Sequence, residues 1–132
     1  MGNLLVDSKV IYPELSYQIG GILFKVFKKL QSGYKEKHVQ RAVADMMANE
    51  GLKFREQVLC EIVFNGKSIG YYKMDFIIEE KIVLEIKVAE RFYQKDYDQV
   101  KNYLLKSNLR LGLLARFGRN SVVIRRILRP TK

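Results

Sequence analysis

Apolar residues follow helical spacing in two segments near the start of the chain. In the first, they recur every three or four positions from Leu15 to Leu30, after a proline that suits a first helical turn and before a stop signal at Ser32-Gly33. The second runs from about Tyr34 to Asn49, with Gly51 as its C-terminal cap. The pattern predicts two helices after a loose lead-in over residues 1 to about 12. The inward stripe of the second helix is Val39, Val43, Met46 and Met47.

The middle of the chain changes to the two-residue period of strands. Residues 54–64 alternate, and the Asn65-Gly66 pair after them is a strong hairpin signal. Two apolar runs follow, over residues 71–78 and 82–88, and a tight turn at residues 79–81 can join them. The sequence therefore predicts three consecutive strands.

Helical spacing returns from about Gln94 to Lys106 and is followed by two strand-like segments, over residues 109–115 and 121–128. A helical crossover of this length favours a parallel pairing of the strands that it joins. The prediction is one α/β domain over residues 1–132, with a core over about 14–128. Its mixed sheet of about five strands is flanked by helices, in the order α-α-β-β-β-α-β-β.

Charged residues interrupt the two most apolar strands. In the run 82–88 the even positions are all aliphatic, so Glu85 and Lys87 share the other face with Val83. Asp75, ten positions before Glu85 on the neighbouring strand, can lie beside it. Two carboxylates and an ammonium on one face suit a hard divalent cation, with the lysine left to hold an attacking water or a charged oxygen. The alternative is a surface ion pair, which is the more common meaning of an isolated E-x-K motif.

Two further polar residues border the predicted core. Glu36 lies at the start of the second helix, one turn before its buried stripe, with Gln40 as its i+4 neighbour. The Glu36 carboxylate could reach the sheet, or Glu36 could be an ordinary first-turn glutamate favoured by the helix dipole. Gln99 flanks the buried stripe of the third helix.

The charge of the chain indicates which kind of partner to expect. The net charge is +10, and no acidic residue follows Asp98, whereas nine basic residues do. Such a stretch favours a polyanion, although a merely solubilising surface has the same composition. The interleaved apolar residues make an anionic membrane a poorer match. The basic residues are Lys101, Lys106, Arg110, Arg116, Arg119, Arg125, Arg126, Arg129 and Lys132.

The single cysteine and single histidine exclude a zinc site of the usual kind. Cys60 lies in a strand-like alternation and is expected to be a buried small hydrophobe, which is consistent with a reducing cytoplasm. No apolar run is long enough to span a membrane, and no signal segment opens the chain. We therefore expect a cytoplasmic protein.

The order of the predicted elements, with Glu36, Asp75, Glu85, Lys87 and Gln99 at their positions, resembles the core of the PD-(D/E)XK nuclease superfamily. The stretch from about Glu14 to Leu128 is most similar to the small GxxExxY proteins, a branch of that superfamily. Two positions depart from the pattern: Val39 replaces the tyrosine that names the branch, and Met74 replaces the superfamily's proline. The matching segments are GYKE (33–36), GYYKMD (70–75), LEIK (84–87), QVKNYL (99–104) and LGLLARFG (111–118).

The resemblance implies a restriction-endonuclease-like fold and metal-dependent cleavage of phosphodiester bonds in DNA or RNA. It implies that Mg²⁺ or Mn²⁺ is held by Asp75, Glu85, the Ile86 backbone carbonyl and, through a water, Glu36. Lys87 would orient the attacking water or offset charge, and Gln99 would position Lys87 or the phosphate. The expected partner is nucleic acid, contacted through its backbone, and a homodimer remains an open option. The alternative is a non-catalytic module on the same fold that binds nucleic acid or another partner.

Overall fold

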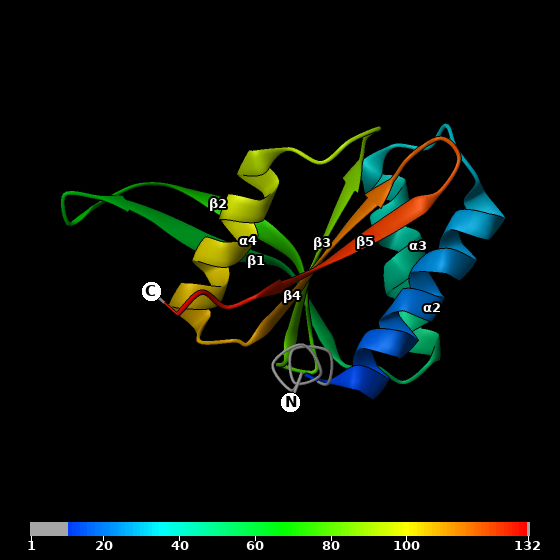
Figure 1. Ribbon diagram of the computed structural model, residues 1–132, viewed down its shortest axis with the longest axis horizontal. Coiled ribbons are helices and arrows are strands. Elements are labelled where there is room, and N and C mark those ends of the chain that lie inside the picture. The colour runs from blue at the N-terminus through cyan, green and yellow to red at the C-terminus, as the bar shows by residue number, and fades with distance from the viewer. Residues whose placement is uncertain (1–10, 132) are drawn as a thin grey trace, which may run out of the picture.

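The computed structural model describes residues 11–131, so most of the expected lead-in lies outside the described residues. Three helices and five strands follow in the order that the sequence predicts, which confirms the α/β class (Figure 1). The elements are α2 (Pro13–Leu30), α3 (Glu36–Asn49), β1 (Phe54–Phe64), β2 (Lys67–Ile78), β3 (Ile82–Val88), α4 (Gln94–Ser107), β4 (Leu111–Phe117) and β5 (Val122–Leu128).

The five strands form one mixed sheet in the order β1-β2-β3-β4-β5. Neighbouring strands are antiparallel except β3 and β4, which run parallel because α4 carries the chain back between them. The prediction of a parallel pair across the third helix is therefore confirmed.

Helices cover both faces of this sheet. On one face, α2 and α3 pack on the even positions of β3, such as Leu84, and on Phe76 of β2. On the other face, α4 packs on Val83 and on the neighbouring strands (Figure 1). Burying one such aliphatic or aromatic side chain stabilises a fold by roughly 1.5–3 kcal/mol. The two-sided burial explains why β3 is almost continuously apolar.

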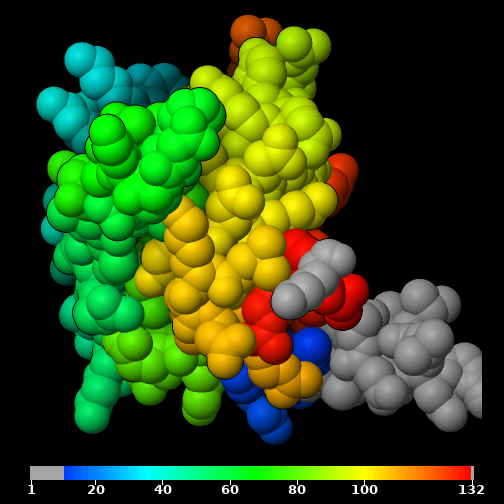
Figure 2. Space-filling view, turned by 90° about the vertical axis from the view of Figure 1, so that its left-hand side faces the viewer, coloured from blue at the N-terminus to red at the C-terminus, as the bar shows by residue number. Residues whose placement is uncertain are grey.

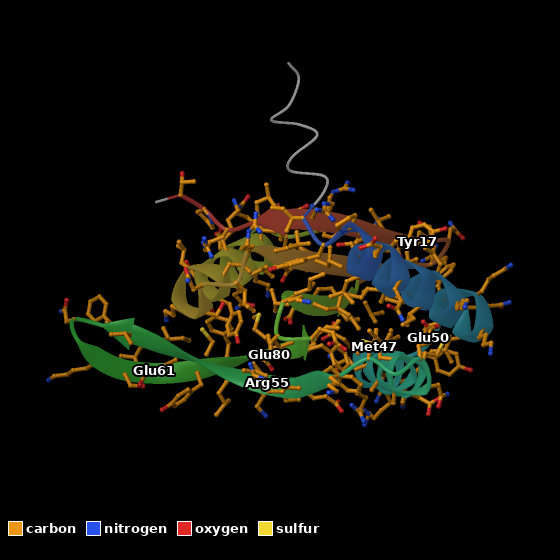
Figure 3. The ribbon with its side chains drawn as sticks, turned by 90° about the horizontal axis from the view of Figure 1, so that it is seen from below. Tyr17, Met47, Glu50, Arg55, Glu61 and Glu80 are labelled. Carbon is orange, nitrogen blue, oxygen red and sulfur yellow. The ribbon has the colours of Figure 1, made fainter. Side chains whose placement is uncertain are left out.

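The β1–β2 hairpin projects from the body of the molecule (Figure 1) and points towards the viewer in the space-filling view (Figure 2). Its tip is the predicted Asn65-Gly66 pair, whose φ angles of 51° and 75° suit a tight hairpin. Glu61 lies on the projecting part, beyond the helices (Figure 3). Several large apolar side chains are exposed there, among them Leu59, Phe64 and Tyr71.

The turn between β2 and β3 fixes the register of the two strands that carry the candidate site. Glu79 and Glu80 both have positive φ, 54° and 52°, and the Lys81 N–H donates to the Ile78 carbonyl at 3.0 Å. Arg55 of β1 holds the Glu80 carboxylate with two bonds of 2.7 and 2.9 Å (Figure 3). These contacts anchor a turn whose backbone conformation is uncommon for residues other than glycine.

Candidate active site

The candidate site lies where β2 and β3 part. Backbone pairing between them ends at Phe76 and Leu84, one position before Asp75 would face Glu85. Beyond that point, carboxylate oxygens accept the hydrogen bonds that backbone carbonyls accept in the paired part of the strands. Glu85 Oε1 accepts from the Asp75 N–H at 2.9 Å, and Asp75 Oδ2 accepts from the Ile86 N–H at 2.7 Å. Both carboxylates therefore lie in the gap between the two strands.

An irregularity in β2 helps to place Asp75 in this gap. Met74 and Ile77 both pack with the α4 cluster, whereas Phe76 packs with the α2 and α3 cluster, so the alternation of faces slips near Asp75. On β1, Gln57 is left out of the strand ladder opposite Asp75 and has a φ of 52°. The carboxylates thus meet in the gap where the two strands part.

Helix α3 supplies a partner for Asp75 from the other side. Gln40 Nε2 donates to Asp75 Oδ1 at 2.9 Å. From the sequence, Gln40 was identified only as the i+4 neighbour of Glu36 on the second helix. With this bond, both oxygens of the buried Asp75 carboxylate accept hydrogen bonds.

Glu36 reaches the sheet, which decides between the two interpretations of this residue. Its Oε2 accepts from the Val88 N–H, at the end of β3, at 3.1 Å. The first turn of α3 is therefore tied to the strand that carries Glu85 and Lys87.

Lys87 lies between two buried carboxylates. Its Nζ is 3.8 Å from Glu85 Oε2 and 3.6 Å from Asp96 Oδ1. Asp96, in the first turn of α4, is only 3% exposed and was missed by the sequence argument. A signal was present, because Asp96 lies four positions before Val100 and so belongs to the buried stripe of its helix.

Gln99 has no contact of the kind expected. Its backbone carbonyl accepts from the Tyr72 hydroxyl at 3.2 Å. Within residues 11–131, no hydrogen bond joins its side chain to Lys87 or to either carboxylate of the gap. Asp96, one turn earlier on α4, is the residue that contacts Lys87.

Burial raises the pKa of both carboxyl groups in the gap, Asp75 and Glu85. It raises the pKa of Glu85 to about 8, and the nearby Asp75 carboxylate adds to the rise. Burial likewise raises the pKa of Asp75 to about 6, although the Ile86 N–H opposes this. For Lys87, burial lowers the pKa, but the surrounding carboxylates, led by Glu85, outweigh it and raise the pKa. Ionising both carboxyls is therefore costly, although Lys87 partly offsets their charge.

These donors fit a hard divalent cation that keeps part of its water shell. In the described part of the chain, no three or more acidic, histidine or cysteine side chains are grouped as a metal cluster. The protein ligands would therefore be Asp75, Glu85 and the Ile86 carbonyl, which faces the same gap as its N–H in an extended strand. Mg²⁺ is commonly bound by one or two carboxylates together with waters and substrate phosphates. A divalent cation would stabilise the ionised form of both carboxyls.

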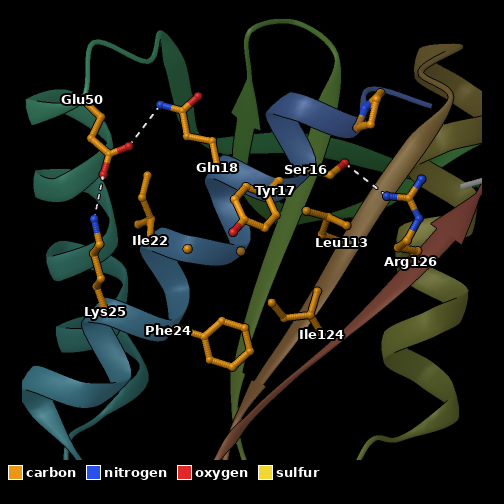
Figure 4. Close-up of a pocket in the computed structure, with 13 residues that line it drawn as sticks. Ser16, Tyr17, Gln18, Ile22, Phe24, Lys25, Glu50, Leu113, Ile124 and Arg126 are labelled. Atoms are coloured by element: carbon orange, nitrogen blue, oxygen red, sulfur yellow. Dashed lines mark hydrogen bonds and ion pairs between the residues drawn. The ribbon is translucent and has the colours of Figure 1, made fainter. Parts of the chain in front are cut away.

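A cavity lies away from the carboxylate site. It has a volume of about 1010 Å³ and lies between α2 and strands β4 and β5, lined by Tyr17, Phe24 and Ile124 among others (Figure 4). Gln18 and Lys25 both contact Glu50 at its rim. None of its lining residues belongs to the carboxylate site.

A mixed sheet with paired carboxylates and a lysine where two strands part is the arrangement expected of a restriction-endonuclease-like domain. The sequence pattern of the PD-(D/E)XK nuclease superfamily matches residues 13–127. The chain belongs to that superfamily.

Among solved structures, the crystal structure of SSO0001 is similar to this chain. The two are 20% identical, with a TM-score of 0.55 over 73% of this chain and 52% of that one. The chain thus spans about half the length of SSO0001, and at this identity the likeness concerns the fold alone. No curated protein matches the chain significantly. No helix in the described residues is long and apolar enough to cross a membrane.

Proposed function

We propose that this chain is a metal-dependent nuclease that hydrolyses phosphodiester bonds of DNA or RNA. The observation that carries the proposal is the buried pair Asp75 and Glu85, each bonded to the other's strand, with Lys87 beside Glu85. We further propose that the chain acts as a single nuclease-like domain. Strongly perturbed carboxylates next to a lysine are typical of catalytic sites.

Assignment to the GxxExxY branch rests on the segment before and within the first turn of α3. Gly33 and Glu36 stand at the positions that name the branch, and Glu36 contacts the end of β3. Val39 stands at the tyrosine position and is buried in the core, so that position contributes packing and no hydroxyl.

Asp75, Glu85 and the Ile86 carbonyl would hold Mg²⁺ or Mn²⁺, and Glu36 would hold a water of that ion from the α3 side. The bound ion would supply Lewis acidity and would lower the pKa of a coordinated water. Gln40 fixes the Asp75 carboxylate by donating to Oδ1. Such a bond orients a ligand without itself touching the ion.

Lys87 would orient the attacking water or offset the charge that develops on the phosphate. Its ammonium is half-buried and is held by Glu85 and Asp96, which restricts where it can point. Asp96 would therefore act through Lys87 as a positioning residue. Gln99 keeps its proposed role only if substrate draws its side chain towards the phosphate.

The test is a cleavage assay over single- and double-stranded DNA and RNA with Mg²⁺ or Mn²⁺, comparing the wild type with Glu85→Ala. Glu61→Ala is the matched control, because Glu61 is an exposed glutamate on the projecting hairpin. We expect metal-dependent cleavage by the wild type and the control but not by Glu85→Ala. A wild type that neither binds Mn²⁺ nor cuts any of these substrates would favour the alternative, a non-catalytic binding module on the same fold.

A further inference from the structure

Two arginines extend the basic side of the site across the sheet. Arg116 of β4 is the register partner of Lys87, so the two side chains are neighbours on one face. Arg125 of β5 pairs with Leu114, two positions before Arg116, and so lies diagonal to Arg116 on the same face. Adjacent strands are about 4.8 Å apart. A row of three cations therefore leads from the carboxylates over β4 to β5.

An aromatic ring holds both guanidinium groups. Phe92 lies in the segment between β3 and α4, and its ring centroid is 5.2 Å from Arg116 Cζ and 5.0 Å from Arg125 Cζ. Stacking on an aromatic ring restrains a guanidinium while leaving its N–H groups free to donate at the edge. Phe92 thus organises the two arginines before any ligand arrives.

Neither arginine is neutralised within the described residues. Arg116 Nη1 donates to the Ala89 carbonyl at 3.2 Å, and its Nε is buried without a hydrogen-bond partner. No carboxylate among residues 11–131 forms an ion pair with Arg116 or Arg125. A partly buried cation without a carboxylate at ion-pair distance is costly, and an anionic ligand on Arg116 would reduce that cost.

The backbone also leaves room for this arrangement. A Cβ on Gly118 would lie 2.8 Å from Arg116 Nη1, closer than real contacts allow. Any larger residue at position 118 would therefore displace the guanidinium.

We infer that Arg116 and Arg125, held on Phe92, bind a backbone phosphodiester group next to the one that is cleaved. The choice of a nucleic-acid phosphate rests on the proposed nuclease function. The planar fork of arginine matches phosphate oxygens and can make paired hydrogen bonds to them. Contacts of this kind fix the position of a strand without reading its sequence.

The test measures binding without cleavage. A labelled oligonucleotide, single-stranded and then duplex, is titrated with protein in EDTA at several salt concentrations, followed by fluorescence anisotropy. The variants are Arg116→Gln and Arg125→Gln. The control is Lys53→Gln, which removes one positive charge at the turn end of β2 and β3, the opposite end of β3 from Lys87. Circular dichroism checks that each variant is folded.

Each arginine variant should weaken binding and lower the slope of log affinity against log salt by about 0.9 on duplex, or about 0.7 on a single strand. The control should keep the wild-type slope. Unchanged slopes in both arginine variants would overturn the inference, even if the wild type cleaves. If Arg116→Gln does not fold, the exposed Arg125 decides the outcome in the same way. Binding that depends on these arginines in a protein without cleavage activity would support phosphate binding by Arg116 and Arg125 and refute the nuclease proposal. A wild type that binds no oligonucleotide would overturn the inference.

Discussion

Replacing Glu85 with glutamine should make the fold more resistant to rising pH. In the folded protein burial raises the pKa of Glu85 from 4.5 to about 8, whereas the unfolded chain ionises freely. The contribution of this group to stability is therefore fully present below pH 4.5 and is lost as the pH rises towards 8. Glutamine keeps an oxygen that can accept the Asp75 N–H but cannot ionise.

The magnitude follows from the size of the shift. One pKa unit corresponds to about 1.4 kcal/mol, so between pH 5 and pH 8 the Glu85 carboxyl should cost the wild type roughly 4 kcal/mol of unfolding free energy. Glu85→Gln should not show this loss. Its stability relative to wild type should therefore rise by that amount across the same range.

Urea unfolding in EDTA at pH 5, 6, 7 and 8 measures the difference directly. Glu61→Gln serves as the control, because it makes the same substitution at an exposed glutamate outside the site. Parallel pH profiles for wild type and Glu85→Gln would refute the reasoning. They would mean that burial does not raise the pKa of Glu85 in the folded protein.

Three further predictions concern Lys87, its partner Asp96, and Gly118 beside Arg116. Lys87→Ala should abolish cleavage and leave Mn²⁺ binding by calorimetry nearly intact, because an ammonium is not a metal ligand; a fully active variant would show that the assigned role is wrong. Asp96→Asn should lower kcat about tenfold or more without changing KM, Asp96→Glu should recover part of the loss, and equal loss in both variants would indicate a purely structural role. Gly118→Ala should weaken oligonucleotide binding at unchanged net charge by displacing Arg116, and wild-type affinity in a folded variant would contradict that placement.

The fold was largely predictable because its patterns are local. The helical stripe after Pro13 and the Asn65-Gly66 turn each depend on residues close in sequence, and the structure has both at the expected positions. The parallel pairing of β3 and β4 followed from the length of the helix between them. Gln99, in contrast, was assigned by resemblance alone, and its side chain makes no predicted contact in the described residues.

The contacts that complete the site could not be derived from spacing along the chain. Gln40 meets Asp75 across 35 positions, and this depends on how α3 lies over the sheet. The slip in β2 opposite Gln57 puts Met74 on the α4 face, whereas strict alternation from Phe76 would put it on the face of α2 and α3, and no residue type there indicates it. Asp96 could have been identified from the sequence, since a carboxylate on an apolar stripe requires a partner.

At the point where β2 and β3 part, the requirements of folding can be distinguished from the requirements of catalysis. Where the strands part, the N–H groups of Asp75 and Ile86 lose their backbone partners, and an unbonded buried N–H costs about 1–3 kcal/mol. Side-chain oxygens restore those bonds, but asparagine and glutamine would restore them equally well. Charge at both positions instead raises the cost of burial. The fold alone therefore explains an acceptor at positions 75 and 85 but not a carboxylate, and this is the physical reason to prefer a metal-binding catalyst over a binding module.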